Sequence, residues 1–455
     1  MPRYRERVVW EGSCAPLEDL LRGLAPAERP VFLRAGAHTI LAWSPDRVLE
    51  GRVRPQARKG SRARPWPRGA AAAFEAACSR MDEEDWIPAD PQAPAGCGWY
   101  GHLGFEAGHL FEAWPWVPPG GVWLPDLCLG RYRQAVLRED GGRARLLVAV
   151  PDPRPARERW EKLRRRPVAP PVPVEPLLKA QGSRRAWIEA VRRLQEWIAA
   201  GELYQANLAR FFEGESPDDP AGLFRHLLHR CRPAHAAFWR DGRGRALLSC
   251  SPELFLEVRG DLLETRPIKG TAPRRSDPGA DATERRQLET SSKERAELTM
   301  IVDMARNDLG RVACPGSVAV PDPGSVRSLP GVHHREAVVR ARWDPGRGLR
   351  RLLAASFPPA SVTGAPKIRA LEAIATLEGR ARGAFCGSFL YWRPGAEARG
   401  RATVLIRTLE AAGRRLRLGV GAGIVWDSEA GREWEETLWK AASLFPALRG
   451  EEALA

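Results

Sequence analysis

Strand-like runs that follow one another across short turns place the strongest limit on the fold of this chain. They lie at 246–250, 253–258, 316–320, 385–391, 403–409 and 415–420. A further run, Leu203–Phe212, alternates with period two, which places Gln205 and Asn207 on one face of a strand. Closely spaced strands favour antiparallel pairing, because a parallel pair needs a long crossover.

Helical patterns separate these strands. Trp187, Val191, Leu194 and Ile198 recur at helical spacing, and Gly201 follows at the position of a C-cap glycine. Further helices are predicted at about 283–307, 366–379 and 428–445. Strands in groups with helices between them indicate an α+β fold, with antiparallel sheets and helices packed outside them.

One proline-rich stretch suggests how the chain is divided. Residues 151–183 hold eight prolines and the basic run Arg164-Arg165-Arg166. We expect neither a helix nor a central strand there, but a linker or a surface wrap between an N-terminal region at 1–150 and a catalytic domain at 184–448. A second Pro/Arg-rich segment, at 52–68, is predicted to be an exposed loop.

Composition excludes several classes of protein. The 71 Lys and Arg residues outnumber the 56 Asp and Glu residues, giving a net charge of +15, but the excess is spread along the chain without a nucleic-acid-binding motif. An arginine-rich protein that attracts small anions explains this charge more simply. The eight cysteines are scattered and read as buried thiols in a reducing compartment. Since no apolar run is long enough to cross a bilayer, we expect a cytoplasmic enzyme.

Two helical segments carry paired acids. Glu294 and Glu297 share one helical face, and Glu433, Glu436 and Lys440 share another. Four such carboxylates can converge on one Mg²⁺, which prefers oxygen ligands. From spacing alone, a solvated helix surface with local salt bridges is the simpler interpretation.

Two further segments suggest chemistry. If the strands near them pair, Glu253 and Lys269 can face one cavity, with Glu253 as an acid and Lys269 as a nucleophile. A surface salt bridge between them is the alternative. Gly419, Gly421 and Gly423 form a run of backbone amides that can hold a carboxylate, although a kinked strand explains the glycines equally well.

Taken together, these segments resemble the chorismate-utilising family, and most of all its aminodeoxychorismate synthase (component I) branch. The matching stretches, in order, are Glu202–Phe212, Ser251–Glu253, Thr265–Arg274, Ser292–Arg311, Ser361–Leu371, Ile406–Thr408 and Gly419–Lys440. The resemblance is dense from about residue 185 to 445 and fainter before the linker. It implies two packed antiparallel sheets flanked by helices, with the active site between them.

The resemblance also implies roles for single residues. Glu297 and Glu436 would bind Mg²⁺, supported by Glu294 and Glu433. His334 matches a histidine near the leaving hydroxyl, in a context that differs from the family pattern. Five residues match positions that bind the carboxylates of chorismate: Thr271, Arg407, Gly421, Gly423 and Lys440.

Two positions indicate the branch of the family. Water-adding members carry a basic lysine where this chain has Gln205, so Gln205 favours an amine nucleophile. Anthranilate-forming members resemble Pro-Ile-Ala-Gly-Thr where this chain has Pro267–Thr271, with Lys269 in place of alanine. The implied reaction is amination of chorismate at C4, on the route to p-aminobenzoate and folate, with Glu253 as the acid and Lys269 as a covalent nucleophile.

The same resemblance implies a partner subunit and alternative functions. Since the chain lacks the G-x-C-x-G motif of glutamine amidotransferases, ammonia is expected from a separate amidotransferase subunit. The segment Pro30–Gly36 lacks the acid and hydroxyl of the family's tryptophan pocket, which argues against tryptophan binding. Anthranilate synthesis is the nearest alternative, isochorismate or salicylate synthesis is disfavoured by Gln205, and a nucleic-acid-binding protein on an inactive scaffold is the most distant.

Overall fold

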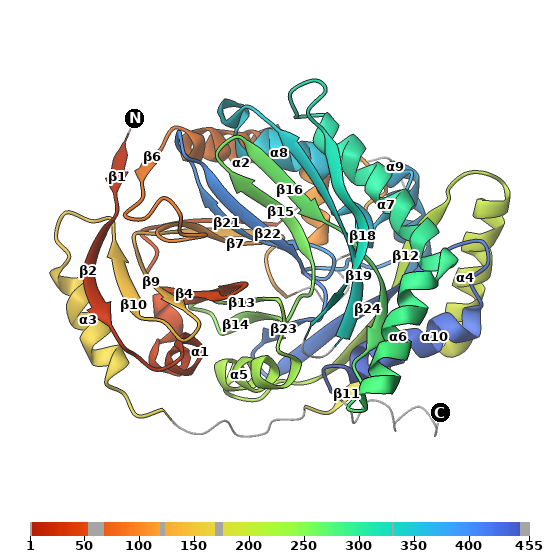
Figure 1. The fold of residues 1–455 in the computed structure, drawn as a ribbon, viewed down its shortest axis with the longest axis horizontal. Coiled ribbons are helices and arrows are strands. Elements are labelled where there is room, and N and C mark those ends of the chain that lie inside the picture. The colour runs from red at the N-terminus through yellow and green to blue at the C-terminus, as the bar shows by residue number, and fades with distance from the viewer. Residues whose placement is uncertain (1, 53–67, 119–122, 169–175, 330–331, 446–455) are drawn as a thin grey trace.

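Two large sheets form the body of the molecule in the computed structural model, which describes residues 2–52, 68–118, 123–168, 176–329 and 332–445 (Figure 1). The first sheet has twelve strands within these residues. In spatial order they are β11 (Leu178–Gln181), β12 (Gln205–Glu215), β24 (Arg415–Ile424), β23 (Thr408–Ala412), β14 (Arg245–Ser249), β13 (His235–Arg240), β3 (Val31–Ala35), β4 (His38–Ala42), β9 (Gln134–Glu139), β10 (Ala144–Val148) and β2 (Arg7–Gly12), with β20 (Gly364–Ala365) beside β12.

The second sheet has ten strands in the described part of the chain. Their order is β17 (Ile268–Pro273), β19 (Val332–Arg342), β16 (Leu262–Arg266), β15 (Leu254–Arg259), β22 (Arg399–Val404), β21 (Ser388–Arg393), β7 (Gly98–Leu103), β8 (Leu127–Tyr132) and β5 (Arg47–Gly51), with β18 (Ala319–Ser328) beside β19. All pairs within both sheets are antiparallel, whereas the short strands β1 (Arg3–Arg5) and β6 (Asp85–Ile87) form a separate parallel pair. The predicted α+β fold with packed antiparallel sheets is confirmed.

Helices cover the outside of the sheets (Figure 1). They are α1 (Leu17–Leu20), α2 (Arg68–Asp82), α3 (Arg154–Arg164), α4 (Arg184–Ala199), α5 (Pro220–Cys231), α6 (Pro278–Thr290), α7 (Ser292–Gly310), α8 (Gly348–Ser356), α9 (Lys367–Glu378) and α10 (Ala430–Ala442). Within the residues the structure describes, none of these helices is both long and apolar enough to span a bilayer. The cytoplasmic location expected from the sequence stays a prediction.

Strands from the first 150 residues lie in both sheets. Strands β2, β3, β4, β9 and β10 extend the first sheet, and β5, β7 and β8 extend the second. Leu33 and Ile40 of the first sheet pack in one buried cluster with Tyr100 and Tyr391 of the second. The N-terminal region therefore completes the sandwich around a core shared with the rest of the chain, and the division into regions at 151–183 stays a prediction.

The expectation that 151–183 holds no helix is wrong, because α3 forms at Arg154–Arg164. Pro153 lies at the N-cap and Pro155 in the first turn, where a missing backbone N–H costs nothing. Trp160 and Leu163 are fully buried and attach the helix to the body of the protein. The 52–68 segment, predicted to be an exposed loop, falls almost wholly outside the described residues.

Two other predicted elements divide in the structure. The helix expected over 283–307 is two helices, α6 and α7, separated at Ser291, whose hydroxyl accepts a hydrogen bond from the Glu294 N–H and so caps α7. The strand expected over 403–409 ends at Val404 in the second sheet, and β23 begins at Thr408 in the first. Period-two patterns do not show where a chain changes sheets.

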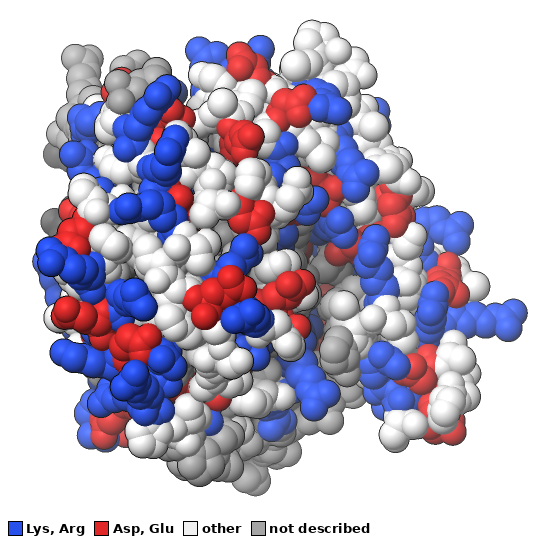
Figure 2. Space-filling view, turned by 60° about the vertical axis from the view of Figure 1, so that its left-hand side comes forward, with Lys and Arg blue, Asp and Glu red and all other residues white. Residues whose placement is uncertain are grey.

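The surface carries charges of both signs. Figure 2 shows Lys and Arg side chains interspersed with Asp and Glu over the face in view. Many surface arginines of the described chain form ion pairs, for example Arg185 with Glu189 and Arg285 with Glu289 on their own helices. This pattern differs from the continuous basic stripe of a nucleic-acid-binding face.

Candidate active site

A bulge in β17 carries Lys269 toward the opposite sheet. β17 pairs with β19, and the register shifts between Ile268 and Thr271, so that Lys269 and Gly270 lie in the irregular step. Gly270 adopts a φ of 81°, a conformation that residues with a Cβ rarely adopt. Bulges of this kind redirect side chains. The Lys269 Nζ lies 3.2 Å from the position that a Cβ would occupy on Gly423 of β24, in the other sheet.

The Lys269 amino group lies among buried polar groups. Burial lowers the pKa of Lys269, and the positive charge of Lys440 lowers it further, against the opposing effect of Glu297. Next to it, the Gln205 side chain is fully buried, and neither of its amide atoms has a hydrogen-bond partner within the described residues. Buried amides normally have partners, so this unsatisfied pair indicates a place where a polar ligand binds.

Gly423 is expected to tolerate no side chain. A Cβ there would lie 2.6 Å from the Gln205 Nε2 as well as 3.2 Å from the Lys269 Nζ. Gly423→Ala should therefore displace both side chains and lower kcat/KM on the order of tenfold or more, with little change in Tm. Steady-state kinetics and thermal unfolding check this, with Gly310→Ala as the control, because a Cβ on Gly310 meets nothing within 4 Å. Equal kinetics for the two variants would contradict it.

Glu253 lies in the interior beside the same lysine. It is only 4% exposed, and burial raises the pKa of its carboxyl to about 7, despite a hydrogen bond from the Ser361 hydroxyl and the positive charge of Lys269. A carboxylic acid with a pKa near neutrality is suited to donate a proton to a leaving group. Glu253 and Lys269, which can face one cavity if their strands pair, interact electrostatically in the structure.

His334 and Thr271 face each other across the β17–β19 pair. The Thr271 Oγ1 and the His334 Nδ1 are 2.8 Å apart in a hydrogen bond. Burial lowers the pKa of His334 to about 3, so the imidazole is neutral at physiological pH. Its Nε2 is buried without a partner in the described structure, and the histidine lines a cavity of about 730 Å³ together with Pro252 and Ile268.

Arg407 lies where the chain crosses from one sheet to the other. It adopts a φ of 50° between β22 and β23, in the left-handed region that is uncommon for residues other than glycine. Burial lowers the pKa of its guanidinium, and the neighbouring groups that counter this effect are the thiols of Cys231 and Cys250 rather than a carboxylate. A buried guanidinium next to thiols is suited to bind an incoming carboxylate.

Lys440 connects α10 to β24. Its Nζ donates a hydrogen bond of 2.7 Å to the Gly421 carbonyl and lies 2.6 Å from the Glu436 carboxylate, one helical turn before it. Gly421 itself has no room for a side chain, since a Cβ would lie 2.7 Å from the Asn207 Nδ2. The structure thus brings Gly421, Gly423 and Lys440 to the same end of β24.

The carboxylates of α7 and α10 approach one another. Burial raises the pKa of Glu294, and the charges of Glu297 and Glu436 raise it further. Burial and Glu436 likewise raise the pKa of Glu433, whose carboxylate also accepts a hydrogen bond of 2.7 Å from Ser428. Burial alone would raise the pKa of Glu436, but nearby lysines, Lys440 first, hold it below its usual value. Mutual repulsion of this kind is what a bound cation relieves.

This acidic set has the chemistry of a magnesium site. Within the described residues, no three His, Cys, Asp or Glu side chains are close enough together to enclose a metal ion. Mg²⁺ commonly takes only one or two protein carboxylates and completes its shell with water and substrate. Glu297 and Glu436, one from each helix, fit such a site, with Glu294 and Glu433 beside them.

Sequence reasoning missed several residues that shape this site. Ser361 bonds Glu253, and Lys293 adds positive charge near Glu436. Gly270 was not singled out, although a glycine inside a strand pattern is a signal for a bulge. A Cβ on Gly270 would lie 2.7 Å from Leu288 and 2.9 Å from the Glu294 carboxylate, so three elements converge at this glycine.

Comparison with known proteins places these features in a family. The family model described as "chorismate binding enzyme" matches residues 36–446. The chain is 40% identical over 350 residues to aminodeoxychorismate synthase component 1 of Klebsiella aerogenes, covering 77% of each chain. It is 35% identical over 383 residues to anthranilate synthase component 1 of Streptomyces coelicolor, covering 79% of this chain and 74% of the other.

A solved structure shows the same fold. Anthranilate synthase component I from Streptococcus pneumoniae TIGR4 superposes with a TM-score of 0.77 at 24% sequence identity, covering 90% of this chain and 92% of that one. Both sheets and the helices around them are therefore shared with a known enzyme architecture.

Proposed function

Because the chain belongs to the family of chorismate-binding enzymes, we propose that it aminates chorismate at C4 with ammonia to give 4-amino-4-deoxychorismate, the precursor of p-aminobenzoate. One observation carries the proposal: the Lys269 amine lies near Gly423, as the Gln205 side chain does, and interacts with Glu253. The name of the Klebsiella relative agrees with this activity.

The proposed mechanism has two allylic steps. The neutral Lys269 amine attacks C2 of chorismate, the double bonds shift, and the C4 hydroxyl leaves as water with a proton from Glu253. Ammonia then forms a bond to C4, the double bonds shift back, and the C2–N bond breaks to release the neutral Lys269 amine. The extra proton on the new C4 ammonium passes to the Glu253 carboxylate. Covalent catalysis replaces one difficult substitution by two easier ones. The lowered pKa of Lys269 and the raised pKa of Glu253 both act in the direction that the first step needs, toward a free amine and a protonated carboxyl.

Substrate binding is assigned to the groups around Lys269. Arg407 and Thr271 bind a carboxylate of chorismate, and Lys440 acts with the backbone of Gly421 and Gly423 on another. A Mg²⁺ ion held by Glu297 and Glu436 would neutralise the ring carboxylate of the substrate. Glu294 and Glu433 maintain the negative field around that position, and His334 lies near the leaving hydroxyl with its neutral imidazole.

Gln205 explains why the nucleophile is an amine. An amide has no useful basicity, so it cannot deprotonate water for attack. Its two unsatisfied buried atoms can accept from and donate to an incoming ammonia molecule or the substrate instead. The proposal therefore excludes isochorismate and salicylate synthesis as the main reaction.

Anthranilate synthesis is the second candidate. The Streptomyces relative of that name matches this chain at 35% identity, so overall similarity alone does not separate the two aminations. Lys269 favours the first candidate, because anthranilate synthesis places nitrogen at C2, where the proposed lysine adduct forms.

The product of the purified chain tests the function. The chain is incubated with chorismate, Mg²⁺ and ammonium salt at mildly alkaline pH, and the product is analysed by mass spectrometry. A product that retains the pyruvyl group and yields p-aminobenzoate with added lyase supports the proposal, whereas anthranilate and free pyruvate would assign the chain to the second candidate. Glutamine is expected to replace ammonium only when a separate amidotransferase subunit is added.

A further inference from the structure

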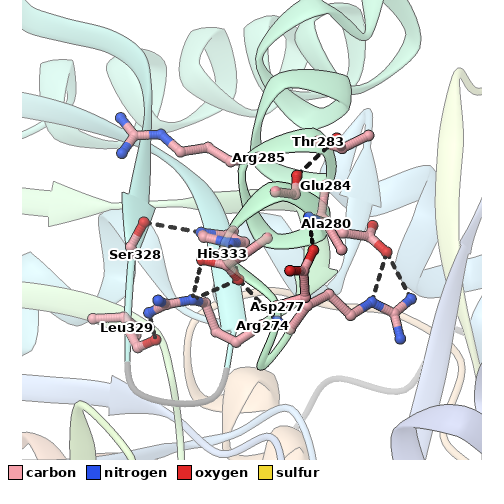
Figure 3. A network of polar contacts seen from close by, with 12 residues as sticks. Arg274, Asp277, Ala280, Thr283, Glu284, Arg285, Ser328, Leu329 and His333 are labelled. Atoms are coloured by element: carbon pink, nitrogen blue, oxygen red, sulfur yellow. Dashed lines mark hydrogen bonds and ion pairs between the residues drawn. The ribbon is translucent and has the colours of Figure 1, made fainter.

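Helix α6 covers the strands that carry Lys269, Thr271 and His334. It begins directly after β17 and contacts β17, β18 and β19, yet Leu288 is its only buried residue. A helix with so little apolar contact depends on a few specific interactions for its position. Figure 3 shows these interactions gathered around His333 and Arg274, with Ser328 and Leu329 of the β18 end beside them.

One carboxylate lies at the centre of this network. Asp281, in the first turns of α6, accepts hydrogen bonds from the Arg274 Nε at 2.9 and 3.0 Å, one to each of its oxygens. Its Oδ1 also accepts from the Arg275 backbone N–H at 2.8 Å and lies 3.0 Å from the His333 Nε2. The four groups come from the helix, from the chain just after β17 and from β19. Asp281 therefore joins both strands of the pair to the helix above them.

The network extends to β18 and remains charged. The His333 Nδ1 is 2.9 Å from the Ser328 hydroxyl, and the Arg274 Nη1 donates to the Leu329 carbonyl at 3.0 Å. Hydrogen bonds from Arg274 and Arg275 hold the pKa of Asp281 well below its usual range, so the carboxylate is ionised at physiological pH. Charge-assisted bonds are the stronger ones, and several on one carboxylate fix geometry as well as adding stability.

A second anchor holds the other end of α6 against the bulge. Leu288 packs so close to Gly270 that a Cβ there would lie 2.7 Å from its side chain. Arg335 of β19 donates hydrogen bonds to the carbonyls of Leu288 and Glu289 at 2.5 and 2.7 Å. The bulge is thus held from above by Leu288, and the strand beyond it is held by Asp281.

We propose that Asp281 is a positioning residue for the reaction: by fixing Arg274, Arg275 and His333 it holds β17 in register and so places Lys269 and Thr271. The proposal rests on the proposed role of Lys269. His333 lies opposite Ala272 and His334 opposite Thr271 in the β17–β19 register, so a shift of this strand end moves the Thr271–His334 pair and the bulge together. A misplacement of about 1 Å can lower the rate of an enzyme on the order of 100-fold.

Asp281→Asn tests the proposal, with Asp277→Ala as a matched control. Asp277 caps the same helix by accepting a hydrogen bond from the Ala280 N–H, but among the described residues it forms no hydrogen bond or ion pair with β17, β18 or β19. Both variants weaken α6, and only Asp281→Asn removes the ionised centre of the network. Arg274→Ala, at a half-exposed position, is a second variant that leaves the buried residues intact.

We expect Asp281→Asn to lower kcat on the order of 10- to 100-fold with a smaller change in KM, and Asp277→Ala to leave kcat within about twofold at a similar loss of Tm. Arg274→Ala should also lower kcat. A second readout is the rate at which an amine-specific reagent labels Lys269 at one fixed pH, measured by peptide mass spectrometry. Labelling should rise several-fold in Asp281→Asn and stay at the wild-type rate in Asp277→Ala.

Equal losses of kcat in Asp281→Asn and Asp277→Ala, or unchanged labelling of Lys269 in Asp281→Asn, would overturn the positioning role. The labelling comparison does not depend on which product the enzyme releases. If the wild type yields anthranilate, the proposed function fails, and the labelling still decides whether Asp281 positions Lys269.

Discussion

Replacing Lys269 with alanine is expected to lower the rate of C4 amination by about 10³-fold or more. The variant lacks the amine that forms the covalent adduct. Lys440, whose charge acts on Lys269, is itself held by Gly421 and Glu436. Quantifying the pyruvyl-retaining product by mass spectrometry over time checks this prediction.

Lys179→Ala is the matched control for the loss of one lysine. Lys179 lies exposed on the edge strand β11, so its replacement removes one lysine side chain without touching the site. Its rate should equal that of the wild type. If Lys269→Ala also aminates chorismate at C4 at the wild-type rate, the covalent scheme is wrong and the reaction does not depend on this lysine.

The second large effect concerns Glu253. Glu253→Gln is expected to reduce kcat by about 10²- to 10⁴-fold, because the amide cannot protonate the leaving hydroxyl. The same variant should be more stable than the wild type at about pH 8.5, since it no longer buries an ionised carboxylate. A substitution that removes activity and adds stability is typical of a residue kept for function.

The sign of the pH effect follows from the raised pKa. Burial raises the pKa of Glu253 to about 7, above its ordinary value, so the folded protein binds this proton more tightly than the unfolded chain does. Ionisation of Glu253 therefore takes stability from the wild type as pH rises from about 4.5 to 7, by a few kcal/mol at most. Glu253→Gln does not have this loss, and the two proteins should have similar stability near pH 4.5.

Urea unfolding at both pH values measures this difference. Glu257→Gln provides the contrast, because Glu257 is a buried acid of β15 that pairs with Arg259 at 2.9 Å and Arg401 at 2.7 Å. Removing its charge deprives the largely buried Arg401 guanidinium of this carboxylate and should destabilise the protein at pH 8.5. A Glu253→Gln variant that is less stable than the wild type at about pH 8.5 would refute the assigned cause of the raised pKa.

Local patterns were sufficient for much of the fold. The spacing of Trp187, Val191 and Leu194 predicted α4, and all three side chains are buried as a stripe. The alternation in Leu203–Phe212 predicted β12 and the shared face of Gln205 and Asn207, both of which are buried. Both elements are determined by residues close together in the sequence. The spacing at which their apolar side chains recur is the signal that distinguishes helix from strand.

Other elements depend on contacts that a local pattern does not contain. α3 forms in a proline-rich segment because its prolines lie at the N-cap and in the first turn. Most of β18 was not predicted, and its side chains alternate between half-buried and exposed instead of following an apolar period. The point near Arg407 where the chain passes from one sheet to the other also has no local sequence signal. It is set by strand pairing, because β22 pairs with β15 in the second sheet and β23 pairs with β14 in the first.

In the candidate site, too, the sequence identified single residues but not the contacts that form only on folding. Motif resemblance identified Lys269, Gln205 and Gly423, but not that a β-bulge carries the lysine across to β24. That contact joins residues of two different sheets, so it exists only after both sheets have formed. The role of Asp281 was likewise not visible, because its partners Arg274 and His333 become neighbours only through the pairing of β17 with β19.

The most direct test of the account is to look for the bond between Lys269 and the substrate. The chain is incubated with chorismate and Mg²⁺ without ammonia, quenched, digested and analysed by peptide mass spectrometry. The account predicts that the peptide containing Lys269 gains the mass of chorismate less one water, and that ammonia added before quenching removes this adduct. No adduct in an enzyme that still aminates C4 when ammonia is supplied would contradict it.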